Sequence, residues 1–188
     1  MNNFPILSLL TFLPIVGMVF VLLLPKKQEL SIKVTTLIVT AIQIVLSIIL
    51  LMNFNYAAGG INDASSFQFI EKFRWIDIPG FAWIGQIKID YFLGVDGLST
   101  PLVLLTAIVT FIATISSWTI DKSVKGYFAM FLLLNTGMMG VFVALDFFLF
   151  YIFWEFTLVP MYFLIGIFGG PRRIYAAVKF FLYTMAGS

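Results

Sequence analysis

The chain has 188 residues, of which 61% are hydrophobic and 11% are charged, with a net charge of +2 and a mean hydropathy of +1.06. Soluble domains average about 45–50% apolar and about 25% charged residues, so this composition predicts a polytopic membrane protein. The chain has no cysteine and no histidine, and therefore lacks the ordinary ligands for iron–sulfur clusters, haem and structural zinc, so we expect no redox cofactor in it. It also has no basic run interleaved with aromatic residues, which argues against a nucleic-acid partner.

Six apolar segments predict an all-α fold of about six transmembrane helices, since about 20 apolar residues are needed to cross a bilayer. The first segment is followed by Lys26 and Lys27 and has no basic residue before it, so we expect a retained helix rather than a cleaved signal peptide. The last segment is short, which predicts an incomplete helix whose end is covered by further chain or by partners. The segments are residues 4–24, 32–54, 98–118, 126–145, 147–168 and 174–188.

Lysines and arginines gather in alternate connections between the predicted helices. Because consecutive helices cross in opposite directions, the first, third and fifth connections fall on one side of the membrane. The positive-inside rule assigns that side to the cytoplasm, so the amino terminus, the loop of residues 55–92 and the Leu145-Asp146 turn are expected outside. The basic residues are Lys26, Lys27, Lys33, Lys122, Lys125, Arg172 and Arg173.

The predicted outer loop, residues 55–92, has the pattern of a small β-hairpin. Ile87, Ile89 and Tyr91 alternate with polar residues, and an aromatic run precedes Pro79-Gly80. Alternation with a period of two around turn residues is typical of paired strands. Two roles are open for this hairpin: a lid on the helix ends or contact with a neighbouring subunit, which we favour, and a catalytic role, for which the loop shows no pattern.

The third helix is predicted to begin at Ser99-Thr100-Pro101. A hydroxyl can cap the free backbone amides there, and proline fits the first turn without losing a needed donor. Asp96 then lies at the membrane interface. We interpret its carboxylate as helping to start the helix, with a part in ion transfer as the alternative.

Glu155 is the principal candidate functional residue. It is the only charged side chain in the apolar stretch of residues 147–168. A carboxylate near the bilayer centre costs about 2.5–3.5 kcal/mol on insertion scales, so such residues usually serve a function. No lysine or arginine lies one turn before or after it on its own helix, so its proton affinity depends on charges that other helices bring. The predicted use is proton or ion movement.

Lys179 is the second candidate, because it is a basic residue about five residues inside an apolar segment. It lies roughly 8 Å from the cytoplasmic end of its helix, whereas Glu155 lies near 20 Å at about 1.5 Å per residue. A direct salt bridge is not expected, but extended side chains and one or two waters could close the gap. The alternative is that Lys179 extends to the cytoplasmic interface. Scattered polar groups within the helices, Asn135 among them, could serve a proton path, but their pattern selects none.

Three stretches carry a resemblance to a known family. They are GVDGLSTPLVLLT (residues 94–106), FLFYIFWEFTLVPMYFLIGIFGG (148–170) and RRIYAAVKFFLYTMAGS (172–188). Together they resemble the antiporter-like membrane subunit M of proton-pumping NADH-quinone oxidoreductase, respiratory complex I. The resemblance covers nearly the whole chain and is weakest over residues 54–91. The stretch from Trp154 to Tyr162, with the basic turn and KFFLYT after it, favours subunit M over its relatives L and N.

The resemblance implies a role for both candidate residues. In that family the glutamate of the fifth helix transfers protons, which implies this role for Glu155. Lys179 matches a lysine of the sixth helix and is implied as part of the cytoplasmic approach. The family also uses a lysine on a seventh helix and later charged groups, which would lie beyond Ser188. Residues 1–188 are therefore expected to form one membrane domain, the amino-terminal part of a larger subunit in the bacterial inner (plasma) membrane.

The implied mechanism is electrostatic. Quinone reduction elsewhere in the complex changes the charges along a line of buried groups: withdrawing a lysine from Glu155 raises its proton affinity, and returning the lysine expels the proton. Flavin, iron–sulfur clusters and quinone are expected in partner subunits, and the expected partners are neighbouring antiporter-like subunits and the lipid bilayer. Two other functions stay open: a subunit of a multisubunit sodium/proton antiporter, and a scaffold in which Glu155 only hydrogen-bonds to neighbouring helices.

Overall fold

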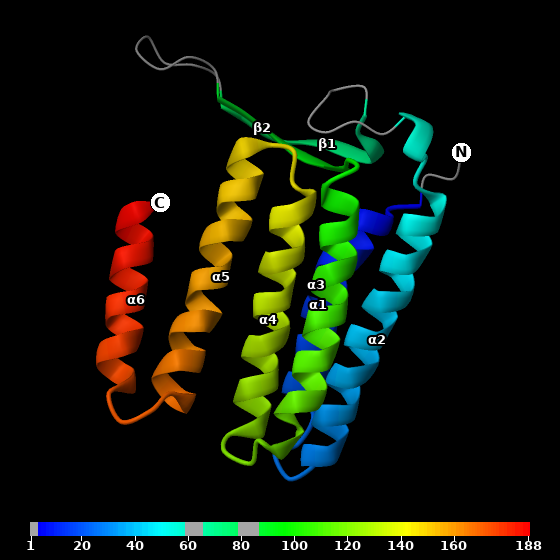
Figure 1. Cartoon of the computed structure of the whole chain (residues 1–188). Coiled ribbons are helices and arrows are strands. Elements are labelled where there is room, and N and C mark those ends of the chain that lie inside the picture. Colours follow the sequence, from blue (N-terminus) through cyan, green and yellow to red (C-terminus); the bar gives the residue numbers. More distant parts are fainter. Residues whose placement is uncertain (1–3, 59–65, 79–86) are drawn as a thin grey trace.

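The computed structural model describes residues 4–58, 66–78 and 87–188, and within them it shows six α-helices and a two-stranded antiparallel sheet (Figure 1). The Pro79-Gly80 turn of the hairpin lies outside the described residues. The predicted helices and the predicted hairpin are confirmed. The elements are α1 (Ile6–Leu23), α2 (Glu29–Asn53), β1 (Gln68–Ile78), β2 (Ile87–Val95), α3 (Ser99–Ser116), α4 (Val124–Val143), α5 (Phe147–Phe168) and α6 (Arg173–Gly187).

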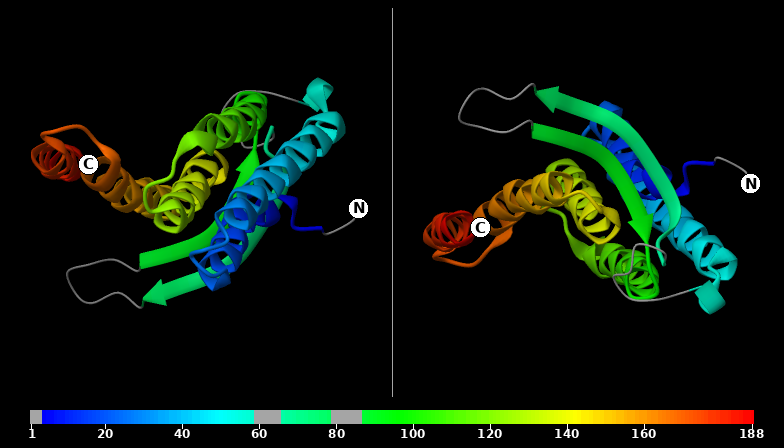
Figure 2. Two further views of the ribbon diagram at one scale, coloured as in Figure 1. Left: turned by 90° about the horizontal axis from the view of Figure 1, so that it is seen from below. Right: turned by 90° about the horizontal axis from the view of Figure 1, so that it is seen from above.

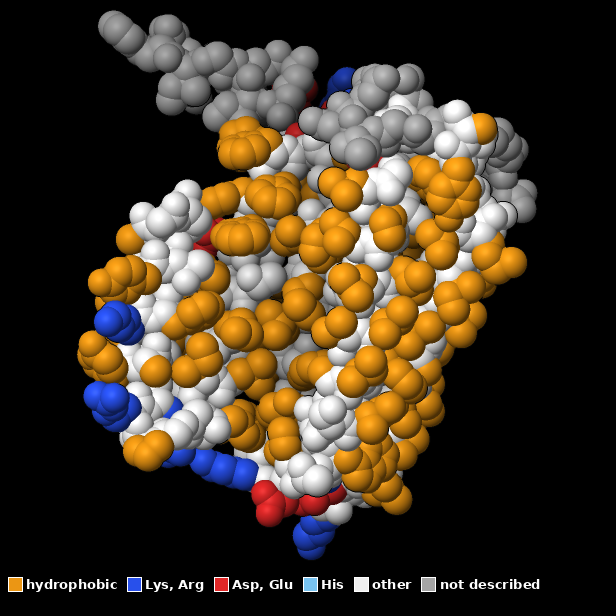
Figure 3. Space-filling view, in the orientation of Figure 1, with side chains coloured by type: hydrophobic (Ala, Val, Ile, Leu, Met, Phe, Trp, Pro, Cys, Tyr) orange, Lys and Arg blue, Asp and Glu red, His pale blue; other side chains and the backbone are white. Residues whose placement is uncertain are grey.

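The helices α1 to α5 are long and apolar enough to cross a membrane, and α6, with 15 residues, is shorter than about 20. Hydrophobic side chains cover most of the helical surface on the face that Figure 3 shows, while basic side chains gather at the lower end and beside α6. A soluble fold would bury these side chains, because exposing them to water is unfavourable. The chain is therefore a membrane protein.

Consecutive helices run in opposite directions, so the connections alternate between the two ends of the bundle (Figure 1). The three short basic connections, α1–α2, α3–α4 and α5–α6, lie together at one end. The hairpin and the α4–α5 turn lie at the opposite end. This arrangement agrees with the alternation of charge along the sequence.

Lysines at the basic end also hold neighbouring helices together. Each of three lysine ammonium groups donates a hydrogen bond to a backbone carbonyl near the carboxyl end of another helix. Such carbonyls have no partner within their own helix and carry a partial negative charge, so a cation stabilises them. The pairs are Lys125 with Leu24 at 2.9 Å, Lys33 with Trp118 at 2.7 Å and Lys122 with Ile167 at 3.0 Å.

At the other end, the two strands lie across the helix ends (Figure 2), and Glu71 of β1 fixes them to α1. Its carboxylate accepts hydrogen bonds from the backbone amides of Leu7 at 2.8 Å and Ser8 at 3.1 Å, and from the Ser8 hydroxyl. Pro5, at the start of α1, supplies no capping side chain, so a strand distant in the sequence supplies the cap.

The hydroxyl of Tyr91 on β2 completes this contact through a 2.6 Å hydrogen bond with the Ser8 hydroxyl. Burial raises the pKa of Tyr91, and so does the nearby Glu71 charge, whereas the hydrogen bond with Ser8 lowers it. The net direction of the pKa shift is upward, so the phenol stays neutral at physiological pH and can remain half-buried between the hairpin and α1.

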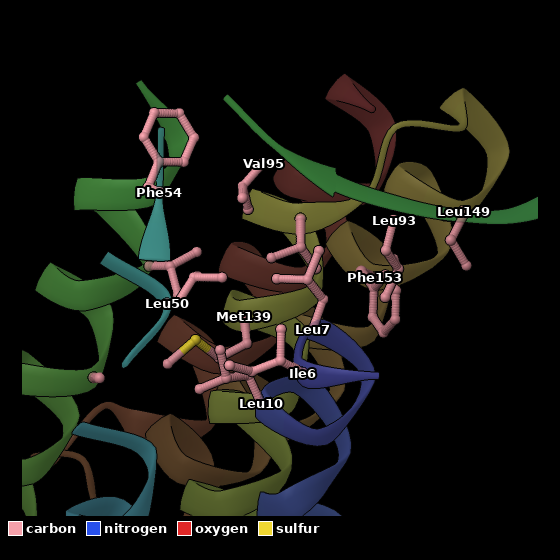
Figure 4. Packing of buried hydrophobic residues seen from close by; sticks show 13 residues of the cluster. Ile6, Leu7, Leu10, Leu50, Phe54, Leu93, Val95, Met139, Leu149 and Phe153 are labelled. Atoms are coloured by element: carbon pink, nitrogen blue, oxygen red, sulfur yellow. The ribbon is translucent and has the colours of Figure 1, made fainter. Parts of the chain in front are cut away.

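A buried apolar cluster lies directly beneath the strands (Figure 4). Leu93 from β2, Leu7 and Leu10 from α1, and Met139 from α4 are all fully buried in it. The backbone amide of Leu145, between α4 and α5, also donates to a β2 carbonyl at 2.9 Å. The hairpin is therefore a lid packed on the helix ends, which confirms that part of the prediction.

The start of α3 agrees with the prediction in position but not in the capping group. Asp96 Oδ1 accepts hydrogen bonds from the amides of Leu98 at 3.1 Å and Ser99 at 2.7 Å, while Ser99 Oγ accepts from the Asp96 amide at 2.8 Å. The expectation of a hydroxyl cap was wrong, because an anionic oxygen is the stronger acceptor for two amides. The geometry supports the helix-starting role of Asp96.

Replacing Glu71 with alanine is expected to destabilise the docked hairpin by about 0.5–2 kcal/mol, the usual cost of losing a helix cap. Limited trypsin digestion at Lys72 and Arg74 measures this. Both side chains are already exposed, but a protease cleaves a strand only when its backbone opens locally, and losing the contact with α1 makes that opening easier. The matched control is Asp90→Asn, which removes the 3.1 Å surface ion pair with Lys72 and should cost at most about 1 kcal/mol. Equal digestion of both variants would contradict the capping role.

Candidate functional site

Two glycines of α4 determine how α5 is oriented. A Cβ atom at Gly140 would overlap the ring of Phe153, and one at Gly137 would lie 2.6 Å from Thr157 Cγ2. Phe153 and Thr157 of α5 therefore face α4 at close range. Glu155 is two residues from each of them, about 200° around the helix, so its side chain lies on the side of α5 away from α4.

Glu155 lies at the level where α6 ends, beside an open cleft. Its Oε1 accepts a 2.6 Å hydrogen bond from the Ser188 hydroxyl, and the side chain is partly exposed. The cleft has a volume of about 460 Å³ and lies between α5 and α6. Glu155 is thirteen residues from Phe168 at the basic end of α5, which corresponds to about 20 Å. The cleft lining is Phe147, Phe150, Tyr151, Trp154, Tyr183, Thr184, Gly187 and Ser188.

Lys179 faces away from α5. On its helix, Ala177 is the buried contact residue, and its Cβ lies 3.6 Å from where a Cβ at Gly166 would be. Lys179 is two residues further on and exposed. Its ammonium lies over the rings of Tyr175 and Tyr183, 5.8 Å and 5.6 Å from their centroids. This cation–π arrangement stabilises an outward position of the side chain.

The structure therefore does not bring Glu155 and Lys179 together. Lys179 is nine residues before Ser188, or about 13 Å below the level of Glu155 along the helix, and within the described ranges the two form no ion pair. The direct salt bridge was not expected, and a contact through water stays a prediction. Among the described residues, no three acidic side chains gather in a way that could hold a metal ion.

A buried polar pair lies elsewhere in the bundle, and the sequence reasoning did not select it. Asn135 Nδ2 of α4 donates to Gln43 Oε1 of α2 at 2.6 Å, and Gln43 Nε2 donates to the Leu10 carbonyl of α1 at 3.0 Å. Both side chains are fully buried. The available signal was a long amide side chain in the middle of the apolar α2 segment, where an unpaired amide would be costly.

Comparison with known proteins shows which subunits this chain is similar to. The family model "NADH-ubiquinone oxidoreductase chain 4, amino terminus" matches residues 73–145, and "NADH:quinone oxidoreductase/Mrp antiporter, TM" matches residues 144–188. NADH-quinone oxidoreductase subunit M of Rickettsia typhi is 36% identical over 197 residues, and chloroplastic NAD(P)H-quinone oxidoreductase chain 4 of Chara vulgaris is 40% identical over 189 residues. Over its whole length the chain is similar to subunit M and chain 4 of NADH-quinone oxidoreductase.

The resemblance seen in the sequence motifs is thus confirmed across the whole chain. Both alignments cover 100% of this chain, which spans 37% of the Rickettsia protein and 36% of the Chara protein. A chain of the membrane-bound sulfane sulfur reductase, an archaeal respiratory membrane complex, shares the fold with a TM-score of 0.69 at 19% identity, over 99% of this chain and 26% of that one. Subunit M relatives are components of multisubunit respiratory membrane complexes.

Proposed function

We propose that this chain forms part of a proton-translocating subunit of NADH-quinone oxidoreductase, in which redox reactions of other subunits drive protons through Glu155. One observation carries the proposal. The only carboxylate within the α5 span is directed away from the packed α4 side and lies at mid-membrane depth beside an open cleft. A carboxylate used only for packing would be expected on the buried helix face, with its oxygens fully paired.

The chemistry required of Glu155 is to take up and release one proton. The Ser188 hydroxyl donates a hydrogen bond to Oε1. In the proposed cycle, a cation that approaches Glu155 favours the carboxylate form. Withdrawing that cation raises the proton affinity of Glu155, so a proton is loaded, and its return releases the proton. Because Lys179 faces outward, the cation that acts directly on Glu155 comes from another part of the protein, and Lys179 belongs to the approach from the basic end.

We also propose a membrane orientation and a set of partner subunits for this chain. The basic end of the bundle faces the cytoplasm of a bacterial cell, and the amino terminus and hairpin lie on the outer side of the plasma membrane, as the charge distribution favours. Other complex I subunits, especially antiporter-like neighbours, surround the chain. Flavin, iron–sulfur clusters and quinone reside in those partners, which carry out the redox chemistry. The described residues work as one membrane domain.

The function is tested with inverted membrane vesicles that contain the full-length protein. NADH should acidify the vesicle interior in a way that depends on this subunit, since deleting it should remove acidification. Sodium-driven proton exchange without NADH would instead support the sodium/proton antiporter, which the name of the second family model also includes. Neither activity, in vesicles that contain the assembled protein, would support the scaffold.

A further inference from the structure

The amide pair of Gln43 and Asn135 leaves one oxygen without a partner. Among the described residues, Asn135 Oδ1 is the buried side-chain polar atom that forms no hydrogen bond. It lies where α1, α2 and α4 meet, in a fully buried side chain. A buried carbonyl oxygen without a donor is costly, and in a membrane no solvent reaches it to compensate.

The direction of this hydrogen-bond chain is fixed by its first member. The Leu10 carbonyl can only accept, so Gln43 must present Nε2 to it. Gln43 Oε1 then faces Asn135, which must present Nδ2 in turn. Rotating either amide by 180° would place two acceptors or two donors against each other. The Leu10 carbonyl thus fixes which end of each amide is the oxygen. Asn135 Oδ1 is an acceptor that points away from Gln43.

Hydroxyl groups of the same three helices are already committed. Each buried threonine or serine of α1, α2 and α4 donates its proton to a carbonyl of its own helix, which leaves none of these protons for Asn135. Such back-bonding is usual for hydroxyls inside helices. The bonds run from Thr11 to Leu7, Thr36 to Ile32, Thr40 to Thr36, Ser47 to Ile44 and Thr136 to Leu132.

We infer that Asn135 Oδ1 binds an internal water molecule, which completes a polar junction of α1, α2 and α4 inside the membrane. Water fits because it donates two protons, is small, and commonly fills such positions in protein interiors. A metal cation does not fit, because it would need several oxygen ligands, and no carboxylate is among the paired groups. The bound water would supply the donor that Asn135 Oδ1 lacks, while the direct hydrogen bonds of Gln43 join α4 to α2 and α1.

This water site is separate from Glu155, although both lie at the same depth. Asn135 is eight residues before the end of α4 at Val143, and Glu155 is eight residues after the start of α5 at Phe147. Each is thus about 12 Å from the hairpin end of its helix. Phe153 and Thr157 lie on the side of α5 that faces α4, whereas Glu155 lies on the other side.

The test is a high-resolution cryo-electron microscopy map of the full-length protein in its assembled complex. We expect a density peak about 2.7–3.2 Å from Asn135 Oδ1, the range of a water hydrogen bond. Asn135→Leu should abolish the peak. Thr114→Val, which removes a buried hydroxyl that bonds to its own helix, should leave it in place. If the leucine variant does not assemble, Asn135→Ser replaces it, and the peak should move or disappear.

Two results would overturn the inference. One is a wild-type map without a peak, in which a protein group donates to Oδ1. The other is a peak surrounded by four or more oxygens at distances of about 2.3–2.6 Å, which indicates a cation. Because the readout is density, its outcome does not depend on whether the complex pumps protons.

Discussion

Replacing Glu155 with glutamine is expected to leave the complex assembled and to reduce NADH-driven proton pumping through this subunit by about a hundredfold or more, the low end of the usual range for loss of a proton-transfer group. Glutamine has the size of glutamate and keeps an oxygen that can accept from the Ser188 hydroxyl. The partly open surroundings of Glu155 also accommodate a neutral amide without loss of packing. What glutamine cannot do is take up and release a proton.

The measurement is the number of protons pumped per NADH oxidised, in inverted vesicles with the assembled complex quantified by native gel electrophoresis. Glu155→Asp should retain part of the pumping, because it keeps a titratable group on a shorter stem. Glu29→Gln is the matched control, since it makes the same change at an exposed glutamate at the start of α2, and it should pump normally. An assembled Glu155→Gln complex with normal pumping would disprove the proton-transfer role.

Replacing Gly140 with leucine is expected to prevent α4 and α5 from packing, with loss of the folded protein. Even a Cβ at this position would overlap the ring of Phe153, which is itself buried in the cluster under the hairpin. Alanine gains about 1 kcal/mol of helix propensity over glycine, whereas overpacking a well-packed core costs about 1–3 kcal/mol and sometimes more. Gly140→Ala should therefore be destabilising overall, and Gly140→Leu much more so.

Thermal unfolding of the purified full-length protein in detergent measures this effect. Gly166→Ala is the matched control on α5, because a Cβ there would meet Ala177 at an ordinary 3.6 Å, and it should be neutral or slightly stabilising. A second change, Phe153→Ala, should partly rescue Gly140→Ala, since the two residues are in contact and their effects are not additive. A Gly140→Ala protein as stable as wild type would show that α4 and α5 are further apart than described.

The sequence alone determined the number and approximate bounds of the helices, their alternating directions, the hairpin and the candidate Glu155. These features follow from one-dimensional constraints. A span needs about 20 apolar residues, charges collect where the chain leaves the bilayer, and an isolated carboxylate in such a span is too costly to be incidental. None of these inferences requires knowing which helix lies beside which.

Only the tertiary structure decided which side chains meet. Glu71 caps α1 through Leu7 and Ser8, which precede it in the sequence by 64 and 63 positions. Gln43 and Asn135 are 92 positions apart. A local sequence pattern cannot reveal either contact. The orientations of Glu155 and Lys179 depend on which helix face packs, because each residue turns a helix by about 100°. Gly137 and Gly140 of α4 fix which face of α5 packs against α4, and the contact of Ala177 with Gly166 fixes which face of α6 packs against α5. These contacts exist only after the helices assemble.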